Sequence, residues 1–395
     1  MNLKELQDVV KNSVAIRFEL QLQPPGGPEQ KIFPPTYPSS NNGRPTYAFE
    51  ERLIRGQKER AVLLDSVPSQ ANRLEQALLN AYRQGLIPLP IIQVHIEGHG
   101  IITHLDAPHR VFDAIFLDSL HNGVPYFNSP LGKSFSASSL NNATALFTYA
   151  PTTLLFGAWD SHSGRRVGAA KFPRAVTSEI IGWGNVSQGT KTSSRIDPLG
   201  IMNMHDLYQA EMGRWTYDPD KAAKNKQGKP VLVKPSAVGH GNIPPSLESE
   251  TGGISVLHCQ QTAVLSLVQL RLMHFPYDDG SIDETRDVAA RTVLAALALC
   301  ALAEQYEQGY QLRSGCLLQP VSEPEWIIDG KTATEKINLE MEPSKARMLL
   351  KDAVKAAEEC GLKWPEKPIE LEPSPELAEL VRRNRELVTV PDEEE

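Results

Sequence analysis

One stretch of the chain gathers the side chains that best suit a phosphate-binding site. Residues 52–75 read R-L-I-R-G-Q-K-E-R-A-V-L-L-D-S-V-P-S-Q-A-N-R-L-E, in which cations precede a short apolar strand at 61–64 and a proline-started helix follows. Cations together with amide and hydroxyl groups at a helix start favour a phosphate chain as the ligand. None of these side chains is an evident nucleophile, acid or base, so the pattern indicates binding. The predicted phosphate contacts are Arg52, Arg55, Lys58, Ser69, Gln70, Asn72 and Arg73.

A second segment, residues 159–174, reads W-D-S-H-S-G-R-R-V-G-A-A-K-F-P-R. It interleaves cations with aromatic rings and glycines. Aromatic faces can stack on bases, at about 1–3 kcal/mol per base, while cations follow the backbone of the nucleic acid. A strand pair with a charged edge explains the same pattern without a ligand. The predicted contacts in this part of the chain are Arg165, Arg166, Lys171 and Arg174, and Arg313 before a strand at 316–320 is a further phosphate candidate whose alternative is a surface arginine.

Three other motifs are weaker. Four histidines between His95 and His109 lie near Glu97 and Asp106, but the H-E-x-x-H spacing of a zinc protease is absent, which favours loop or core histidines. Residues 132–134 resemble the end of a P-loop, although Phe127 stands where that motif needs glycine. Residues 184–189 have one residue too many for a nucleophile elbow. We therefore predict no catalytic residue, no metal and no cofactor.

Composition indicates an ordinary globular protein. The chain has 395 residues, of which 41% are hydrophobic and 22% charged. Its four cysteines form no C-x-x-C pair, which favours a reducing cytoplasm. The charged N-terminus does not resemble a signal peptide, and the longest apolar run, 293–303, is about half of a bilayer span.

The net charge of −8 is unevenly distributed. Residues 321–395 hold 11 Lys+Arg and 19 Asp+Glu, whereas the preceding 320 residues hold 29 of each. Because the local field decides binding, a basic surface remains possible on the larger part despite the acidic total.

Hydrophobic periodicity predicts a compact α+β sheet with helices on one face over the first 120 residues. The expected elements there are a strand at 13–22, an exposed loop at 23–45, a helix from 68 to 85, a strand at 91–96 and a helix at 107–120. Residues 121–255 show few clear periods. We expect there a strand or hairpin at 146–159 and long loops at 174–197 and 221–253. Beyond them we expect a strand or helix at 255–270, a helix at 286–308, a strand at 316–320 and helices at 344–360 and 375–388.

The motifs R-L-I-R-G, L-D-S-V-P-S-Q-A-N-R-L-E, K-F-P-R and L-R-S-G-C-L-L resemble the backbone subunit of the type I-G (formerly I-U) CRISPR Cascade complex, a member of the RAMP superfamily. The likeness covers about residues 10–320. It implies a palm of RNA-recognition-motif (ferredoxin-like) topology in residues 1–320, with finger and thumb insertions at about 23–45 and 121–255. Residues 321–395 would form an acidic helical C-terminal extension.

The resemblance also implies a role. Several copies would oligomerise along one guide RNA (crRNA) as a helical filament and expose its bases for pairing to target DNA. The subunit itself would not cut nucleic acid, because cutting in such cytoplasmic antiviral complexes is left to a recruited helicase–nuclease. Its partners would be crRNA, other copies of itself and other Cascade subunits, with no membrane.

Two alternatives stay open. One is a metal-dependent ribonuclease or phosphodiesterase that uses His95, Glu97, His99 and Asp106. The other is a protein-only scaffold that recruits a partner through the helices at 344–388.

Overall fold

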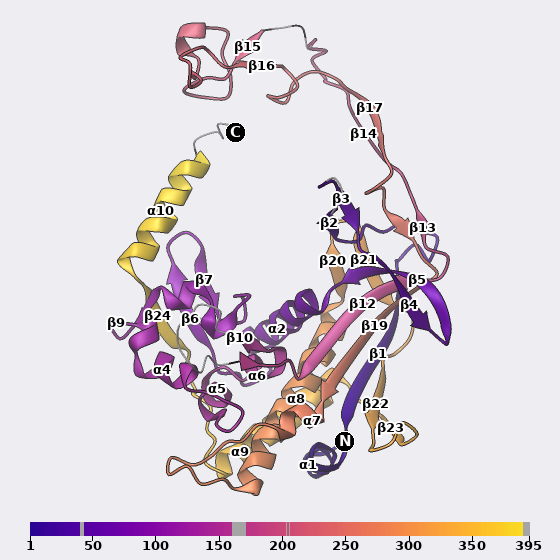
Figure 1. The fold of residues 1–395 in the computed structure, drawn as a ribbon, viewed down its shortest axis with the longest axis vertical. Helices are drawn as coiled ribbons and strands as arrows, with labels where there is room; N and C mark the ends of the chain where they lie inside the picture. The colour runs from indigo at the N-terminus through magenta and orange to yellow at the C-terminus, as the bar shows by residue number, and fades with distance from the viewer. Residues whose placement is uncertain (40–42, 160–170, 203, 205, 390–395) are drawn as a thin grey trace.

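The computed structural model describes residues 1–39, 43–159, 171–202, 204 and 206–389 (Figure 1). The fold is mixed α+β, as the sequence predicts. Its main sheet runs in the order β20-β21-β1-β19-β12-β5-β4, and β22 and β23 extend it beside β1. The strands are β1 (Ala15–Gln23), β4 (Phe49–Ile54), β5 (Gln57–Asp65), β12 (Val176–Trp183), β19 (His258–Ser266), β20 (Tyr310–Arg313), β21 (Cys316–Pro320), β22 (Glu325–Asp329) and β23 (Lys336–Leu339).

One face of the main sheet is apolar and covered by helices. Along β1, Ile16, Phe18 and Leu20 are buried while the residues between them are half-exposed, which is the period-two pattern of a one-sided strand. Two helices contact each other on this face, α2 (Val67–Arg83) and α8 (Glu284–Gln308). The other face of the sheet remains polar.

A second sheet joins distant parts of the chain. It runs in the order β7 (Gly100–Thr103), β6 (Ile92–Ile96), β24 (Ile369–Pro373), β8 (Ser119–His121) and β9 (Val124–Pro125). Strand β24 lies parallel to β6 and antiparallel to β8. The C-terminal segment therefore completes a sheet begun 270 residues earlier.

A long arm leaves the main sheet between β12 and β19. Its shaft is the ribbon of β14 (Lys191–Arg195) and β17 (Ile243–Glu248), with β13 (Ser187–Gln188) and β18 (Ile254–Ser255) at its base. At its far end β15 (Leu207–Tyr208) pairs with β16 (Leu232–Val233). Figure 1 shows this end, which we call the knob (residues 207–241), standing well away from the body.

The remaining elements are short or peripheral. They are α1 (Leu3–Asn12), β2 (Thr36–Pro38), β3 (Pro45–Tyr47), η1 (Arg110–Phe112), α3 (Ala114–Leu117), η2 (Tyr126–Asn128), α4 (Pro130–Ser136), α5 (Thr144–Tyr149), α6 (Thr152–Phe156), β10 (Ala158–Trp159), β11 (Lys171–Phe172), η3 (Pro219–Lys221), α7 (Leu267–Arg271), α9 (Pro343–Glu359) and α10 (Pro375–Thr389). No helix in the described ranges has the length and hydrophobicity of a membrane span.

The strongly periodic elements are confirmed. Strands lie at 15–23, 92–96 and 316–320, and helices at 67–83, 284–308, 343–359 and 375–389, within two residues of the predicted bounds. The segment 255–270, left open between strand and helix, is strand β19 followed by the short helix α7.

The helix predicted at 107–120 is wrong. Arg110 has a positive φ of 54°, which no interior residue of a right-handed helix adopts. Asp113 then caps a single turn, accepting a hydrogen bond from the amide of Ile115 at 3.2 Å, and the chain continues as β8. The apolar spacing came from side chains of two separate short elements, η1 and α3.

The strand or hairpin predicted at 146–159 is also wrong over most of its length. Helices α5 and α6 occupy it, separated by Pro151, and only Ala158–Trp159 is a strand. Every residue of α6 is buried, and a fully buried apolar run does not reveal its period.

Two predicted loops contain core structure. Strand β12, an interior strand of the main sheet between β19 and β5, lies inside the loop predicted at 174–197. Its buried residues include Ser178, which interrupts the apolar pattern. Ile32, inside the loop predicted at 23–45, is buried and forms an isolated bridge with Ile254 at the base of the arm.

The last 75 residues are not purely helical. Besides α9 and α10 they supply β22 to the main sheet, β23 beside it, and β24 to the second sheet. Trp364 lies between α9 and β24, where its indole donates a hydrogen bond to the carbonyl of Phe147 at 2.9 Å. This ring also packs 6.0 Å from the ring of Phe147.

We expect Trp364→Ala to destabilise the whole protein by about 3–5 kcal/mol, because it removes a large buried ring and leaves a carbonyl unpaired. Chemical denaturation monitored by circular dichroism measures this. The matched control is Glu366→Ala two residues away, which is exposed and should change stability by less than about 0.5 kcal/mol. Equal, small effects of both changes would mean that the C-terminal segment contributes little to the fold.

Candidate nucleic-acid interface

The predicted phosphate contacts at the start of α2 gather around a buried carboxylate of the protein itself. Asp65, at the end of β5, has no exposed surface. Its two oxygens accept hydrogen bonds from Ser69 at 2.8 Å and from Gln70 at 2.6 Å. They also accept from Arg73 at 2.9 Å and from Arg313 at 3.2 Å. Four of the predicted ligands of an external anion are thus held by an internal one.

The two arginines reach further into the protein. Arg73 also donates to the carbonyls of Gln311 and Leu312, and Arg313 donates to the carbonyl of Leu64 at 2.8 Å. These bonds tie α2 to the turn between β20 and β21. Strand β5, helix α2 and strand β20 are thereby held together around the charge of Asp65, as in other buried ion pairs whose groups are all hydrogen-bonded.

The side chain of Gln70 faces the core, whereas the sequence predicted that it would contact a phosphate. It is buried, and its amide oxygen accepts hydrogen bonds from Ser178 at 2.9 Å and Gln261 at 2.9 Å. Gln305 on α8 donates to the same oxygen at 3.2 Å. This cluster joins α2, β12, β19 and α8 beneath the sheet.

The cations before α2 lie on the hairpin of β4 and β5, not ahead of a short strand. Arg52 donates hydrogen bonds to Glu179 on β12 and to Glu50. These bonds, the one to Glu179 first, raise the pKa of Arg52. Lys58 lies 4.0 Å from Glu51 at the exposed edge. Arg55 occupies the turn with a positive φ of 51°.

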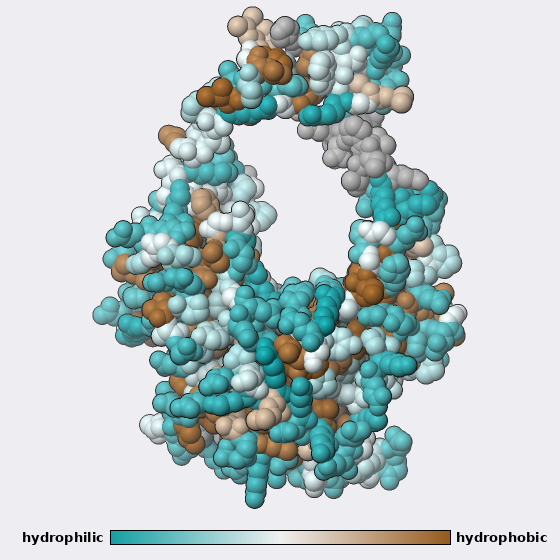
Figure 2. Space-filling view, turned by 180° about the vertical axis from the view of Figure 1, so that it is seen from behind, coloured by the Kyte–Doolittle hydropathy of each residue, from teal (hydrophilic) through white to brown (hydrophobic). Residues whose placement is uncertain are grey.

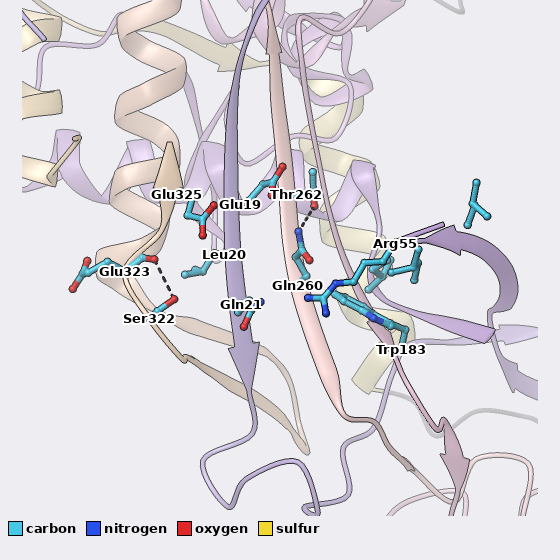
Figure 3. A pocket seen from close by; sticks show the side chains of 13 residues that line it. Glu19, Leu20, Gln21, Arg55, Trp183, Gln260, Thr262, Ser322, Glu323 and Glu325 are labelled. Atoms are coloured by element: carbon cyan, nitrogen blue, oxygen red, sulfur yellow. Dashed lines mark hydrogen bonds between the residues drawn. The ribbon is translucent and has the colours of Figure 1, made fainter. Parts of the chain in front are cut away.

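Arg55 borders a hollow on the open face of the main sheet, with a volume of about 600 Å³ (Figure 3). Figure 3 shows Arg55 beside Trp183 on one side and Ser322 and Glu323 on the other. Three carboxylates line this hollow, Glu19, Glu323 and Glu325, against the single cation Arg55. The local charge therefore disfavours a polyanion on this face.

A different hollow brings three predicted residues together. Asn72 on the exposed side of α2 faces Lys171 and Arg174 across a space of about 480 Å³, which we call the α2 groove. The groove is lined by Pro68, Ala71, Asn72, Pro108, His109, Arg110, Phe156, Gly157, Ala158, Trp159, Lys171, Phe172, Pro173 and Arg174. No carboxylate is among these lining residues.

Trp159 gives the α2 groove an aromatic wall. Its side chain is 63% exposed, and the ammonium of Lys171 lies 5.8 Å from its ring centroid. The two residues face each other on the paired strands β10 and β11. An exposed indole beside two cations and an amide can stack on a base and neutralise phosphates.

The floor of the groove is a buried ion pair that sequence reasoning missed. Arg110 binds both oxygens of Glu75 at 2.7 Å and donates to the carbonyl of Gly157 at 2.9 Å. Burial raises the pKa of Glu75 to about 7, against the opposing effect of Arg110. Glu75 ends the S-Q-A-N-R-L-E motif, and its partner could not be identified from spacing because Arg110 is 35 residues away.

Gly157 lines the groove beside Arg174. Its φ is +85°, and a Cβ there would lie 3.0 Å from Cγ of Arg174 and 3.1 Å from the carbonyl oxygen of Phe172. Glycine therefore lets the chain turn into β10 while Arg174 lies close against it.

The histidines are dispersed. His104 is buried, and burial lowers its pKa to about 3, whereas His95 and His109 are exposed. Asp106 accepts hydrogen bonds from the amide and hydroxyl of Thr103 at 2.9 Å and 2.7 Å. Among the described residues, no three His, Cys, Asp or Glu side chains come close enough to hold a metal ion. Arg165 and Arg166 lie outside the described residues.

Comparison with known proteins gives one family. Residues 16–187 match a family described as CRISPR-associated protein GSU0053, and the match indicates a CRISPR-associated protein. It spans β1, the β4–β5 hairpin, α2, the α2 groove and β12. No curated protein matches the chain.

We expect Asp65→Asn to lower the free energy of unfolding by about 3–5 kcal/mol, because Arg73 and Arg313 lose their buried counter-charge. Urea denaturation measures the loss, and Asp106→Asn, whose carboxylate is half-exposed, is the control. If Asp65→Asn left stability unchanged while weakening RNA binding, the cluster would be a ligand site and not a structural one.

The buried His104 predicts a pH dependence. The pKa of His104 in the folded protein lies below the unfolded value of about 6.5. Between these two pKa values the unfolded chain binds a proton at His104 and the folded protein does not. The contribution of neutral His104 to the free energy of unfolding is therefore complete above pH 6.5. It falls by up to about 1.4 kcal/mol per pH unit as the pH drops from 6.5 towards the folded pKa near 3. Denaturation of the protein and of His104→Leu between pH 4 and 7 measures this; identical slopes would contradict it.

Proposed function

We propose that this chain is a non-catalytic, guide-RNA-binding backbone subunit of a cytoplasmic CRISPR surveillance complex of the type I-G kind. Several copies would line one crRNA and present it for pairing to target DNA, together with other Cascade subunits and a recruited helicase–nuclease. The observation that carries the proposal is the α2 groove. It joins Asn72, Lys171 and Arg174 to an exposed indole, and no carboxylate is among its described lining residues.

The topology supports the same proposal. Strand β1, helix α2, strands β12 and β19, helix α8 and strand β21 follow one another as β-α-β-β-α-β. Their order in the sheet is fourth, first, third, second, with both helices on one face. This order supports a ferredoxin-like palm, the topology of the RNA-recognition motif. The arm would be the large insertion between the second and third palm strands.

The CRISPR-associated family supports the proposed setting, since its match includes the whole α2 groove. The chemistry supports the mode of binding. Lys171 is a point charge with an exposed side chain, and Arg174 lies against Gly157. Such groups hold a phosphate backbone without reading its sequence. Base identity would remain free for pairing.

The groove predicts a salt-dependent, sequence-independent affinity for single-stranded RNA. Replacing Lys171 and Arg174 together by Gln should reduce the magnitude of the slope of log K against log salt by about 1.4. Each phosphate contact on a single strand releases about 0.7 counterions, and the double variant loses two such contacts. Filter binding of an unstructured RNA at several salt concentrations measures this. Trp159→Ala should weaken binding by about 1–3 kcal/mol, with little change in that slope.

The control pair is Lys351→Gln with Lys355→Gln, two exposed lysines on α9 away from the groove. If the control and groove variants gave the same curves as the unmodified protein, the groove would not be the RNA site. If the purified protein never retained nucleic acid and bound none, the scaffold alternative would replace the proposal.

A further inference from the structure

The knob at the end of the arm carries a lysine-rich segment that contains no acidic residue. Between residues 221 and 234 there are five lysines and neither Asp nor Glu. Lys221 lies 3.5 Å from Asp218, but the other four are exposed and have no carboxylate partner among the described residues. These four are Lys224, Lys226, Lys229 and Lys234.

Three of these lysines project from one ordered turn. Asn225 accepts hydrogen bonds from the amides of Gln227 and Lys229, both at 3.0 Å. Gly228 adopts a φ of +75°, and Lys224 forms a bridge with Pro230 that closes the turn. Lys224, Lys226 and Lys229 therefore stand close together on a defined hairpin end, with their mutual repulsion uncompensated.

The knob is folded, so these charges are held in place. Leu207, Ala210 and Ala222 are buried within the knob, and Ala210 forms a bridge with Ala222. At the junction with the shaft, the carboxylate of Asp197 accepts hydrogen bonds from the amides of Ile201 at 3.2 Å and Gly241 at 2.9 Å. These backbone bonds, the one from Gly241 first, lower the pKa of Asp197.

The knob and helix α2 border the same opening. Figure 2 shows the molecule as an open frame, with the arm on one side, the knob at the top and the body below. In Figure 1 the helix α2 lies at the lower border of this opening. A nucleic acid that enters the α2 groove and continues into the opening would meet the lysines on its far side.

We infer that Lys224, Lys226 and Lys229 form a second binding site, for the phosphate backbone of a nucleic acid, separate from the α2 groove. The site is a set of point charges on an exposed turn without a pocket, so it contacts the backbone only and does not select a sequence. The inference that the ligand is a nucleic acid rests on the proposed function. RNA in the complex and DNA paired to it offer the same phosphate chemistry.

The test compares three variants of the full chain. Lys224, Lys226 and Lys229 are replaced together by Gln in the knob variant, Lys171 and Arg174 in the groove variant, and Lys351, Lys355 and Lys367 in the control. The probes are one mixed sequence as single-stranded RNA, as single-stranded DNA and as duplex DNA. Binding is measured by fluorescence anisotropy between about 50 and 300 mM salt, after circular dichroism has shown that each variant is folded.

We expect the knob variant to lower the salt slope by about 2 on a single strand, or by about 2.7 on a duplex, for at least one probe, while the control changes none. The probe that responds identifies the source of the phosphates as RNA, DNA or both. If the knob variant matched the control on all probes while the groove variant lost affinity, the knob site would be overturned and the proposed function would stand. If the groove variant also matched the control, the groove assignment would fail separately.

A protein partner would give a different result. In nuclease-treated protein, analytical ultracentrifugation compares self-association of the knob variant and the control. Lost self-association with unchanged nucleic-acid binding would show that the lysines contact another copy of the chain, and would overturn the inference.

Discussion

The buried carboxylate of Asp65 is the interaction on which the arrangement around α2 depends. An ionised group without solvent contact is costly unless it is paired and fully hydrogen-bonded. Asp65 meets that condition only with the start of α2 and the turn before β21 both in place, because Ser69, Gln70, Arg73 and Arg313 come from these two elements. The direction in which α2 leaves the sheet is thereby fixed, and with it one wall of the α2 groove.

The chain separates its cations by role. The arginines around the sheet are largely committed to internal carboxylates, as Arg110 is to Glu75 and Arg52 to Glu179. Their planar, multiply donating heads suit such fixed geometry. The lysines of the knob stay in solvent with their charge uncompensated. An overall acidic protein can in this way present two basic surfaces, because the paired arginines add little to the external field.

Sequence reasoning succeeded where one face of an element is buried. Strand β1 and helix α2 show a clear one-sided pattern, and each was predicted within two residues. It failed where burial hides the period, as in α6, and where a polar residue serves the core. In β12 the buried Ser178 interrupts the apolar alternation, so the strand was not predicted.

For the site, the sequence gives the residue types but not the direction in which each side chain points. The sequence singled out residues 52–75 as a phosphate-binding stretch, yet Gln70 and Arg73 point inward while their neighbour Asn72 points into the groove. A one-residue step on a helix turns a side chain by about 100°, so spacing decides contact only after the packing is known. Glu75 and Arg110 could be paired only by the fold.

The central claim is that RNA lies in the α2 groove against Trp159. Ultraviolet crosslinking of the RNA-bound protein, followed by mass spectrometry of the crosslinked peptides, tests it most directly. The account predicts adducts on Trp159 or within residues 171–174. Adducts confined to the open face of the sheet, at Trp183 and His258, would contradict it.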